Sequence, residues 1–434
     1  MKIVWHMPTL RRAGCGLSKR AVELAVRAAA AGHTVRFVVD HRKCDGDLRE
    51  IAGIPVERIK TDAPIPWHWS LQARARRHAA SQALCAIRNE HDLLVTSQPE
   101  VAAVYGSLAN RSPLVFVCGG TTLLHDAKDQ CRLAGQGTLH CAAAALDRTL
   151  KRRNERAAVQ RCDIAVFNSV HTRERVIATY GVDPAKCFTV YGGADSEQFM
   201  PVDASSRSVI RGRLGIPSGV FVICWSGRLS PEKHVALLID AAARMEQENL
   251  RVVLLGDGPL RQELEIRVAH HQLEKIVLFA GEQRSVHHWL QAADVFAFPS
   301  RGESFGNSLA EAMNCGLPCV ALRPDGRTIC NASLEILDDG RCGLLVDRDD
   351  PHDFAESLER LRADSALRIE LGMAARVRAS NMFTWDRASR EFISLLERLA
   401  SDGSTSAARP EIVNKRLDAQ CMIERSRWNS VSQT

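Results

Sequence analysis

The chain has 434 residues, 45% hydrophobic and 25% charged, which is ordinary globular usage and enough for two domains with full cores. Its 57 basic and 51 acidic residues leave a net charge of +6, which favours anionic partners but does not indicate a nucleic-acid-binding protein. No apolar run approaches the roughly 20 residues that cross a bilayer, and the first residues have no secretory signal. We therefore expect a cytoplasmic protein.

Strand-like and helix-like segments alternate from the first residue, which indicates parallel sheets built from βα units. The strands predicted in the first half are 2–6, 34–40, 92–97, 113–120, 163–169 and 187–193. The helix predicted at 17–32 has an apolar face and a polar face. Its apolar face holds Leu17, Ala21, Leu24, Ala25 and Ala28, and its outer face holds Lys19, Arg20 and Glu23.

A second unit follows residues 200–219, which lack strong periodicity and are interpreted as a connector. The strands predicted in this unit are 220–227, 251–258, 275–281, 294–300, 318–322 and 343–347. A last helix is predicted at 385–399, followed by a polar linker. Two doubly wound domains in series would have a cleft between them, with the carboxyl ends of both sheets facing it.

The 14 cysteines are scattered singly and include no CxxC pair, so we predict neither a disulfide framework nor a zinc site. Cys224 is expected to be a free buried thiol. Two Asp-x-Asp segments have the spacing of a metal–diphosphate motif, but we interpret both as solvated surface turns and expect no metal. They are Asp45-Gly46-Asp47 and Asp347-Arg348-Asp349.

Glu303 and Glu311 lie eight positions apart in the stretch SRGESFGNSLAEAMNCG, around a glycine and a predicted helix start. On one continuous helix they would be roughly 12 Å apart along the axis, at about 1.5 Å per residue. Paired carboxylates that act on a glycosidic bond lie roughly 5 to 9.5 Å apart. The spacing therefore favours two contacts on one elongated ligand.

The predicted helix start lies between these glutamates, where free backbone N–H groups and the helix dipole favour an anion such as a diphosphate. A second interpretation stays open here. Ser308 and Glu311 also fit a capping box, in which Glu311 would only satisfy a backbone donor of the helix.

The segment FPSRGESFGNSLAEAMNCGLPCVA resembles the signature of the retaining glycosyltransferases of group 1, family 4, marked by two glutamates with seven residues between them. The resemblance implies an α/β fold of the GT-B type: two doubly wound Rossmann-like domains facing a central cleft, with a C-terminal helix that crosses back. It implies an acceptor-binding domain at 1–198 and a nucleotide-sugar-binding domain at 199–383. Residues 384–400 would form the crossing helix, and 401–434 a disordered tail.

The resemblance also implies roles for single residues. Glu303 would hold the hydroxyls of the donor sugar, and Glu311 the ribose of the nucleotide. Arg228 and Lys233, in WSGRLSPEKH, would neutralise the departing diphosphate, although an isolated pair of this kind also fits a solvated basic loop. The residues expected near the anomeric carbon, the phosphates or the nucleotide are Gly16, Gly227, Gly256, Gly258, Phe305, Gly306, Asn307 and Ser308.

Several positions depart from the family pattern or leave alternatives open. Gly256 and Gly258 also fit a plain βα turn, and Arg261 stands where the dinucleotide fingerprint needs a glycine, so an NAD enzyme is not expected. His234 stands where the family commonly has glycine. His125 is the candidate replacement for the family's histidine near the donor sugar, against the alternative of a solvated loop residue.

Two basic stretches, 67–84 and 147–161, are predicted as helices that meet an anionic acceptor or an anionic bilayer, with an ordinary exposed helix face as the alternative. Peripheral contact with the cytoplasmic face of the inner membrane would suit a glycan that grows on a lipid. No nucleic-acid partner is expected.

These observations predict a retaining hexosyltransferase that uses a nucleotide diphosphate sugar, with a UDP-sugar favoured. The acceptor would be a hydroxyl of a growing bacterial cell-surface glycan, such as lipopolysaccharide or exopolysaccharide. No cofactor is expected, and the family's front-side mechanism implies no protein nucleophile. The alternatives are a sugar-nucleotide epimerase or hydrolase of the same fold and a catalytically silent scaffold.

Overall fold

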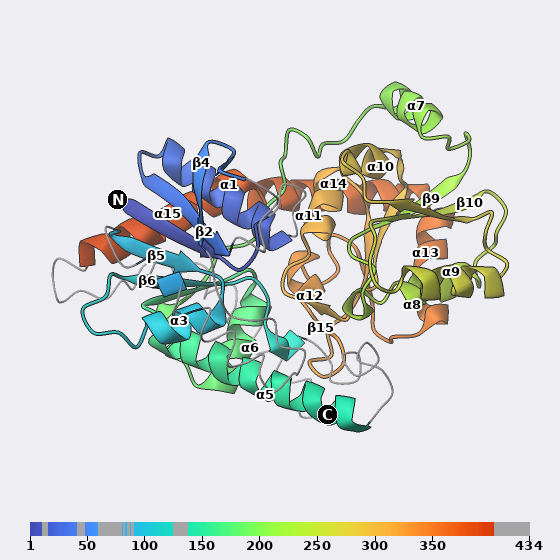
Figure 1. The fold of residues 1–434 in the computed structure, drawn as a ribbon. Coiled ribbons are helices and arrows are strands. Elements are labelled where there is room, and N and C mark those ends of the chain that lie inside the picture. Colours follow the sequence, from blue (N-terminus) through green and yellow to red (C-terminus); the bar gives the residue numbers. More distant parts are fainter. Residues whose placement is uncertain are drawn as a thin grey trace.

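The structure, a computed structural model, describes residues 1–10, 16–40, 48–59, 80, 83, 84, 87, 91–124 and 138–402. These residues form two lobes, each built on its own parallel sheet (Figure 1). None of the described helices has both the length and the apolar character that a bilayer crossing requires. The predicted tail from residue 403 and most of the basic segment 67–84 lie outside the described residues.

The first sheet has eight strands in the order β3-β4-β2-β1-β5-β6-β7-β8, all parallel except the β3/β4 pair. All six strands predicted in the first half are confirmed. The edge pair was missed because Pro55, Glu57 and Arg58 interrupt the apolar pattern. The strands are β1 (Lys2–Met7), β2 (Thr34–Asp40), β3 (Glu50–Ile51), β4 (Ile54–Ile59), β5 (Leu93–Thr96), β6 (Leu114–Cys118), β7 (Ile164–Phe167) and β8 (Cys187–Thr189).

The second sheet has six parallel strands in the order β11-β10-β9-β12-β14-β16, and all six predicted strands are confirmed. A separate two-stranded ladder, β13 with β15, was not predicted, because two residues per strand show no periodicity. The strands are β9 (Phe221–Ser226), β10 (Leu250–Leu255), β11 (Val277–Gly281), β12 (Val295–Phe298), β13 (Gly302–Glu303), β14 (Cys319–Leu322), β15 (Cys330–Asn331) and β16 (Leu344–Val346).

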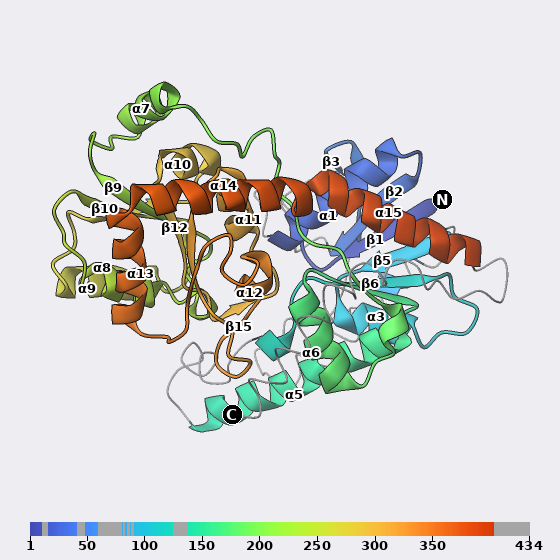
Figure 2. The ribbon, with the colours of Figure 1, turned by 180° about the vertical axis from the view of Figure 1, so that it is seen from behind.

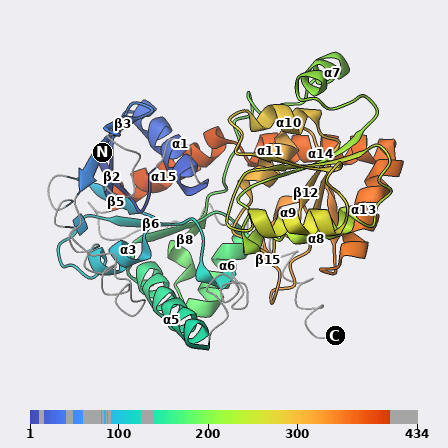
Figure 3. The ribbon, with the colours of Figure 1, turned by 45° about the vertical axis from the view of Figure 1, so that its right-hand side comes forward.

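Helices cover both faces of each sheet, as Figure 3 shows from an oblique side. In the first lobe they are α1 (Gly16–Ala30), α3 (Pro99–Tyr105), α5 (Thr138–Arg161) and α6 (Val170–Tyr180). In the second they are α8 (Val235–Ala242), α9 (Arg261–His270), α10 (Val286–Ala292), α11 (Asn307–Asn314), α12 (Ser333–Ile336) and α13 (Pro351–Ala363). Each lobe is therefore a three-layer sandwich, with apolar side chains filling both interfaces.

Helix α7 (Ala204–Arg213) corrects the interpretation of residues 200–219 as a connector. No residue of α7 is buried, so it has no apolar stripe that a sequence pattern can show. Its start is fixed locally instead, since the Asp203 side chain accepts a hydrogen bond from the Ser206 N–H.

Helices α14 (Ser365–Met382) and α15 (Trp385–Asp402) cross the back of both lobes in succession (Figure 2). The first packs into the second lobe and the next into the first, where Phe392 stacks on Trp5 with ring centroids 5.4 Å apart. Beside this crossing, Ala194 N donates to Phe383 O at 2.9 Å, so the two connections between the lobes lie side by side. The predicted crossing helix is confirmed.

Arg20 on α1 is not on the outer face as predicted but is 3% exposed. The end of β8 covers it, and its guanidinium donates to Val190 O at 2.8 Å. Burial lowers the pKa of Arg20 to about 10. The helical periodicity of the sequence predicted an exposed Arg20, because a periodic pattern does not show that the flanks of α1 are also covered.

Candidate active site

The strand order of the second sheet changes direction between β9 and β12, because β10 and β11 follow on one side and β14 and β16 on the other. Open parallel sheets bind ligands beyond the carboxyl ends of their strands at such a switch point. The loop after β9 carries Gly227 and Arg228, and the loop after β12 leads to Glu303. The fold therefore brings both predicted donor-binding loops to one place.

Lys233 and Glu303 meet at this switch point. Lys233 ends the short 3₁₀ turn η4 (Pro231–Lys233), and its ammonium contacts Glu303 Oε2. Burial lowers the pKa of Lys233, and the Glu232 carboxylate opposes that shift. The contact with Glu303 favours the ammonium further, so we treat Lys233 as a cation. Because Glu303 lies in β13 and not on a helix, the separation expected from one continuous helix does not apply.

Arg228 lies at the exposed end of the same loop. Its guanidinium makes no hydrogen bond or ion pair with any of the residues described for this chain. It is therefore available to an anion, whereas Lys233 already has an acidic neighbour.

Helix α11 begins directly after Gly306, which has a φ of +94°. A Cβ at this glycine would lie 2.8 Å from Phe298 Cζ, so the turn needs glycine for its conformation and for space. Within the described part of the chain no side chain caps the helix, which leaves its first N–H groups for an anion. The capping-box alternative is wrong, because Ser308 lies inside the helix and not at its cap.

Glu311 is 8% exposed, and its Oε1 accepts a hydrogen bond from Lys19 Nζ at 2.7 Å. Lys19 comes from α1 in the other lobe, so the ion pair bridges the two lobes. Gly16, at the start of α1, faces Asn307, and a Cβ there would lie 2.9 Å from Asn307 Nδ2. The end of the predicted glycine-rich loop therefore meets the start of α11.

The Gly256–Gly258 turn packs on the Gly227 loop. Gly256 has a φ of +125°, and a Cβ there would lie 1.9 Å from Gly227 O. A Cβ at Gly258 would lie 2.4 Å from Leu229 O. Both glycines thus allow the close approach of two backbones and fix the loop that carries Arg228.

The other residues and segments singled out in the sequence have different outcomes. Phe305 is 2% exposed and packs on Phe383 with ring centroids 5.3 Å apart, so its ring belongs to the core of the second lobe. His125 and the Asp45–Asp47 segment lie outside the described residues. The solvated turn expected at Asp347–Asp349 is wrong for Asp349, whose side chain is 18% exposed and binds Arg301.

The second lobe contacts the first around the end of β6 and the start of α6. Ser304 Oγ donates to Gly119 O at 3.0 Å. The Glu335 carboxylate accepts from the backbone N–H groups of Val170 and His171 at 2.8 and 2.9 Å, which places an acidic group at the N-terminus of α6. These contacts join the two lobes next to the candidate site.

Sequence reasoning missed Lys19, Ser304 and Glu335 as site or interface residues. Lys19 has the position of an ordinary solvated residue on its helix, and Glu335 has that of a surface acid. Only Ser304 had a local signal, since it lies inside the glutamate signature.

Two known protein families match the chain, one in each lobe. Residues 15–198 match the family described as Glycosyltransferase Family 4, and residues 220–364 match Glycosyl transferases group 1. The chain belongs to the group 1, family 4 glycosyltransferases. The family membership expected from the glutamate signature is thereby confirmed.

A curated relative in this glycosyltransferase family is the D-inositol 3-phosphate glycosyltransferase of Nocardioides sp. (strain ATCC BAA-499 / JS614). It is 31% identical over 267 residues, which cover 57% of this chain and 56% of that protein. The chain thus spans little more than half the length of this relative.

Solved glycosyltransferase structures share the fold. Sucrose-phosphate synthase from Thermosynechococcus elongatus has a TM-score of 0.75 at 19% identity, and the match covers 93% of this chain and 100% of that one. HepE of Anabaena, solved with UDP and glucose, has a TM-score of 0.71 at 22% identity over 92% and 100%. The predicted GT-B architecture is confirmed.

Proposed function

We propose that this chain is a retaining glycosyltransferase that moves a hexosyl unit from a UDP-sugar to an acceptor hydroxyl. The observation that carries the proposal is the arrangement around α11. Two carboxylates, each beside a lysine, flank an uncapped helix start at the switch point of the second sheet. A nucleotide sugar has the length, the anionic centre and the hydroxyls at both ends that such an arrangement fits.

In this proposal the diphosphate lies at the start of α11, near Arg228 and Lys233. Glu303 binds hydroxyls of the sugar, and Glu311 binds the ribose. The bond between the anomeric carbon and the phosphate oxygen breaks while the acceptor oxygen bonds to the same face of the sugar. The leaving phosphate oxygen takes the acceptor's proton, and the two cations stabilise the departing diphosphate.

The domain roles follow from the same proposal, with the first lobe selecting the acceptor and the second binding the donor. Closure of the lobes would exclude water that hydrolyses the donor. HepE, which was solved with UDP and glucose, supports UDP-glucose as the first donor to test.

The acceptor we propose is a hydroxyl of a lipid-linked bacterial cell-surface glycan at the cytoplasmic face of the inner membrane. Exposed arginines on α5 (Arg152, Arg153 and Arg156) support contact with an anionic surface. A second candidate acceptor is D-inositol 3-phosphate, because the Nocardioides relative is named for it.

The test begins with thermal shifts of the protein against UDP, GDP and ADP, since a bound nucleotide raises stability by mass action. UDP-glucose is then incubated with each acceptor, and NMR of the product's anomeric proton decides whether configuration is retained. Release of UDP that never depends on an acceptor would favour a hydrolase, and interconversion of the donor sugar an epimerase. No nucleotide binding at all would support a silent scaffold.

A further inference from the structure

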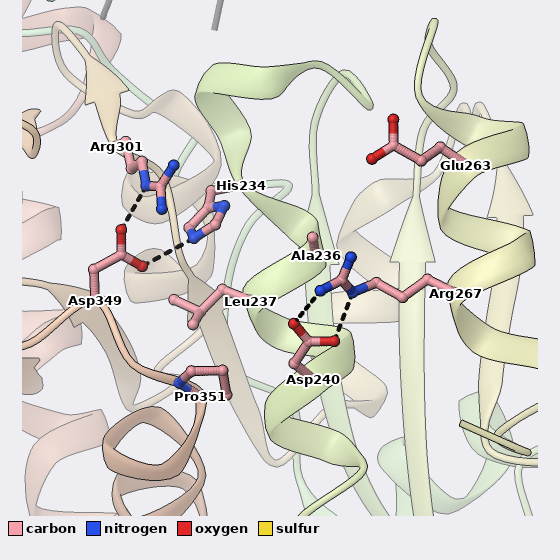
Figure 4. Close-up of a pocket in the computed structure, with 9 residues that line it drawn as sticks. All are labelled: His234, Ala236, Leu237, Asp240, Glu263, Arg267, Arg301, Asp349 and Pro351. Atoms are coloured by element: carbon pink, nitrogen blue, oxygen red, sulfur yellow. Dashed lines mark hydrogen bonds and ion pairs between the residues drawn. The ribbon is translucent and has the colours of Figure 1, made fainter. Parts of the chain in front are cut away.

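A polar pocket of the second lobe lies beside the proposed donor site and is lined by two aspartates, each bound to an arginine (Figure 4). Asp349 is bonded by Arg301 Nε at 2.5 Å and by His234 Nε2 at 2.9 Å. Asp240 is bonded by Arg267 Nε at 2.6 Å and by the His271 ring at 3.0 Å. Their side chains are 18% and 14% exposed, so the two clusters are closely matched in burial and charge.

The two aspartates differ in the segments that their partners hold. Arg267 and His271 lie on α9 and at its end, outside the two loops that carry Lys233 and Glu303. His234, in contrast, directly follows Lys233, and Arg301 precedes Glu303 by two residues. Asp349 therefore joins the two loops that carry the Lys233–Glu303 pair.

Backbone contacts reinforce this link between the loops. Arg301 N donates to Glu232 O at 2.9 Å, and Cys330 N donates to Arg301 O at 2.6 Å. Glu232 is the neighbour of Lys233, so the backbone and the Asp349 carboxylate connect the same two segments.

The backbone conformation of His234 is also unusual. Its φ of +50° lies in the left-handed region, which non-glycine residues seldom adopt. A histidine at this position has a cost that glycine avoids, and its ring is the group that Asp349 holds. The left-handed turn at His234 thus directs the imidazole toward Asp349, so the turn and the contact act together to hold the Lys233 loop.

We propose that Asp349 is a positioning residue, which holds the Lys233 and Glu303 side chains in register through His234 and Arg301. In this proposal Asp349 itself contacts neither the donor nor the acceptor. The inference deepens the proposed function, because it names a residue outside the donor site that sets the geometry between the diphosphate and the sugar.

The test compares Asp349→Asn with Asp240→Asn, which removes a matched carboxylate whose side-chain partners, Arg267 and His271, lie outside both loops. With UDP-glucose as donor, Asp349→Asn is expected to lower kcat about tenfold or more and to change the Kd of UDP less than about threefold. Both variants should lower Tm by a similar amount, because each removes a paired carboxylate of similar burial. Asp240→Asn, however, should leave kcat within about twofold of the wild type. Equal kcat for the two variants would overturn the inference.

A second measurement needs no substrate. Tm is compared for His234→Gly, Asp349→Asn and the double variant, and the two changes are expected to be non-additive because they break one contact. Crystal structures of the two Asn variants should show the Lys233–Glu303 contact altered only in Asp349→Asn. If the wild type neither binds UDP nor transfers glucose, the proposed function fails. Additive Tm changes with an undisturbed contact would refute the positioning role in either case.

Discussion

Lys19 and Glu311 form a 2.7 Å ion pair that connects α1 of the first lobe to α11 of the second. Glu311 is buried and Lys19 is about one-third exposed. In the proposed function this carboxylate also binds the ribose, so Lys19 orients a donor-binding group from the opposite lobe.

Replacing Lys19 by Met should raise KM for UDP-glucose several-fold and lower the free energy of unfolding by about 1 kcal/mol, as expected for a partly exposed pair. Combining it with Glu311→Gln should cost less than the sum of the single changes, because both remove the same contact. Additive effects on KM would show that Lys19 acts elsewhere.

Replacing Lys233 by Ala should lower kcat by about 10²- to 10³-fold, since it removes charge stabilisation of the departing diphosphate. Lys275→Ala, at an exposed lysine of the same lobe, serves as the control and should leave kcat unchanged. Steady-state kinetics at saturating donor measure both. A kcat for Lys233→Ala close to that of the control would remove Lys233 from the proposed mechanism.

Gly256→Ala should destabilise the protein by about 2 to 4 kcal/mol, because its Cβ meets a backbone carbonyl and its φ disfavours any side chain. The matched change Gly212→Ala, in α7 where nothing lies within 4 Å of the new Cβ, should be neutral or stabilising. Urea unfolding of both variants measures the difference. Equal urea midpoints for the two variants would mean that the Gly256 turn can shift to make room for the methyl group at no cost in stability.

Glu335→Gln should weaken lobe closure, since the carboxylate no longer places a negative charge at the two N–H groups of α6. We expect a larger radius of gyration by small-angle X-ray scattering and a KM for UDP-glucose raised several-fold. Glu356→Gln, at an exposed glutamate of α13, is the control. An unchanged radius of gyration would argue against Glu335 as a closing contact.

His171 makes the stability depend on pH. Burial, with a smaller effect of Arg175, lowers its pKa to about 4, from 6.5 for the unfolded chain. The unfolded state therefore binds more protons between these values, and stability should fall as the pH drops from about 6.5 to about 4. His171→Gln should flatten this part of the profile, measured as urea midpoints at pH 7 and 5. The same slope in both proteins would contradict the assignment.

The strands of both sheets were predictable because buried parallel strands are short apolar runs separated by polar or glycine-rich loops. The elements that were missed carry no such pattern. Helix α7 buries no residue, and β4 contains Pro55 and two charged residues. Their positions depend on neighbours that a local pattern does not contain.

The donor loops were predictable for a similar reason, since the glutamate signature is contiguous in the sequence. The contacts that hold these loops and Glu311 in place were harder to find. Lys19 lies 292 positions from Glu311, and Asp349 lies 115 positions from His234. Nothing local to Lys19 distinguishes it from a solvated lysine, so only the closed fold reveals the contact.

Because α15 contributes Phe392 and Leu396 to the core of the first lobe, that lobe is assembled from both ends of the chain. A ribosome that has released only the first half of the protein has made a lobe with an uncovered apolar surface around Trp5. The N-terminal half therefore cannot reach its mature packing until the ribosome has also made α15.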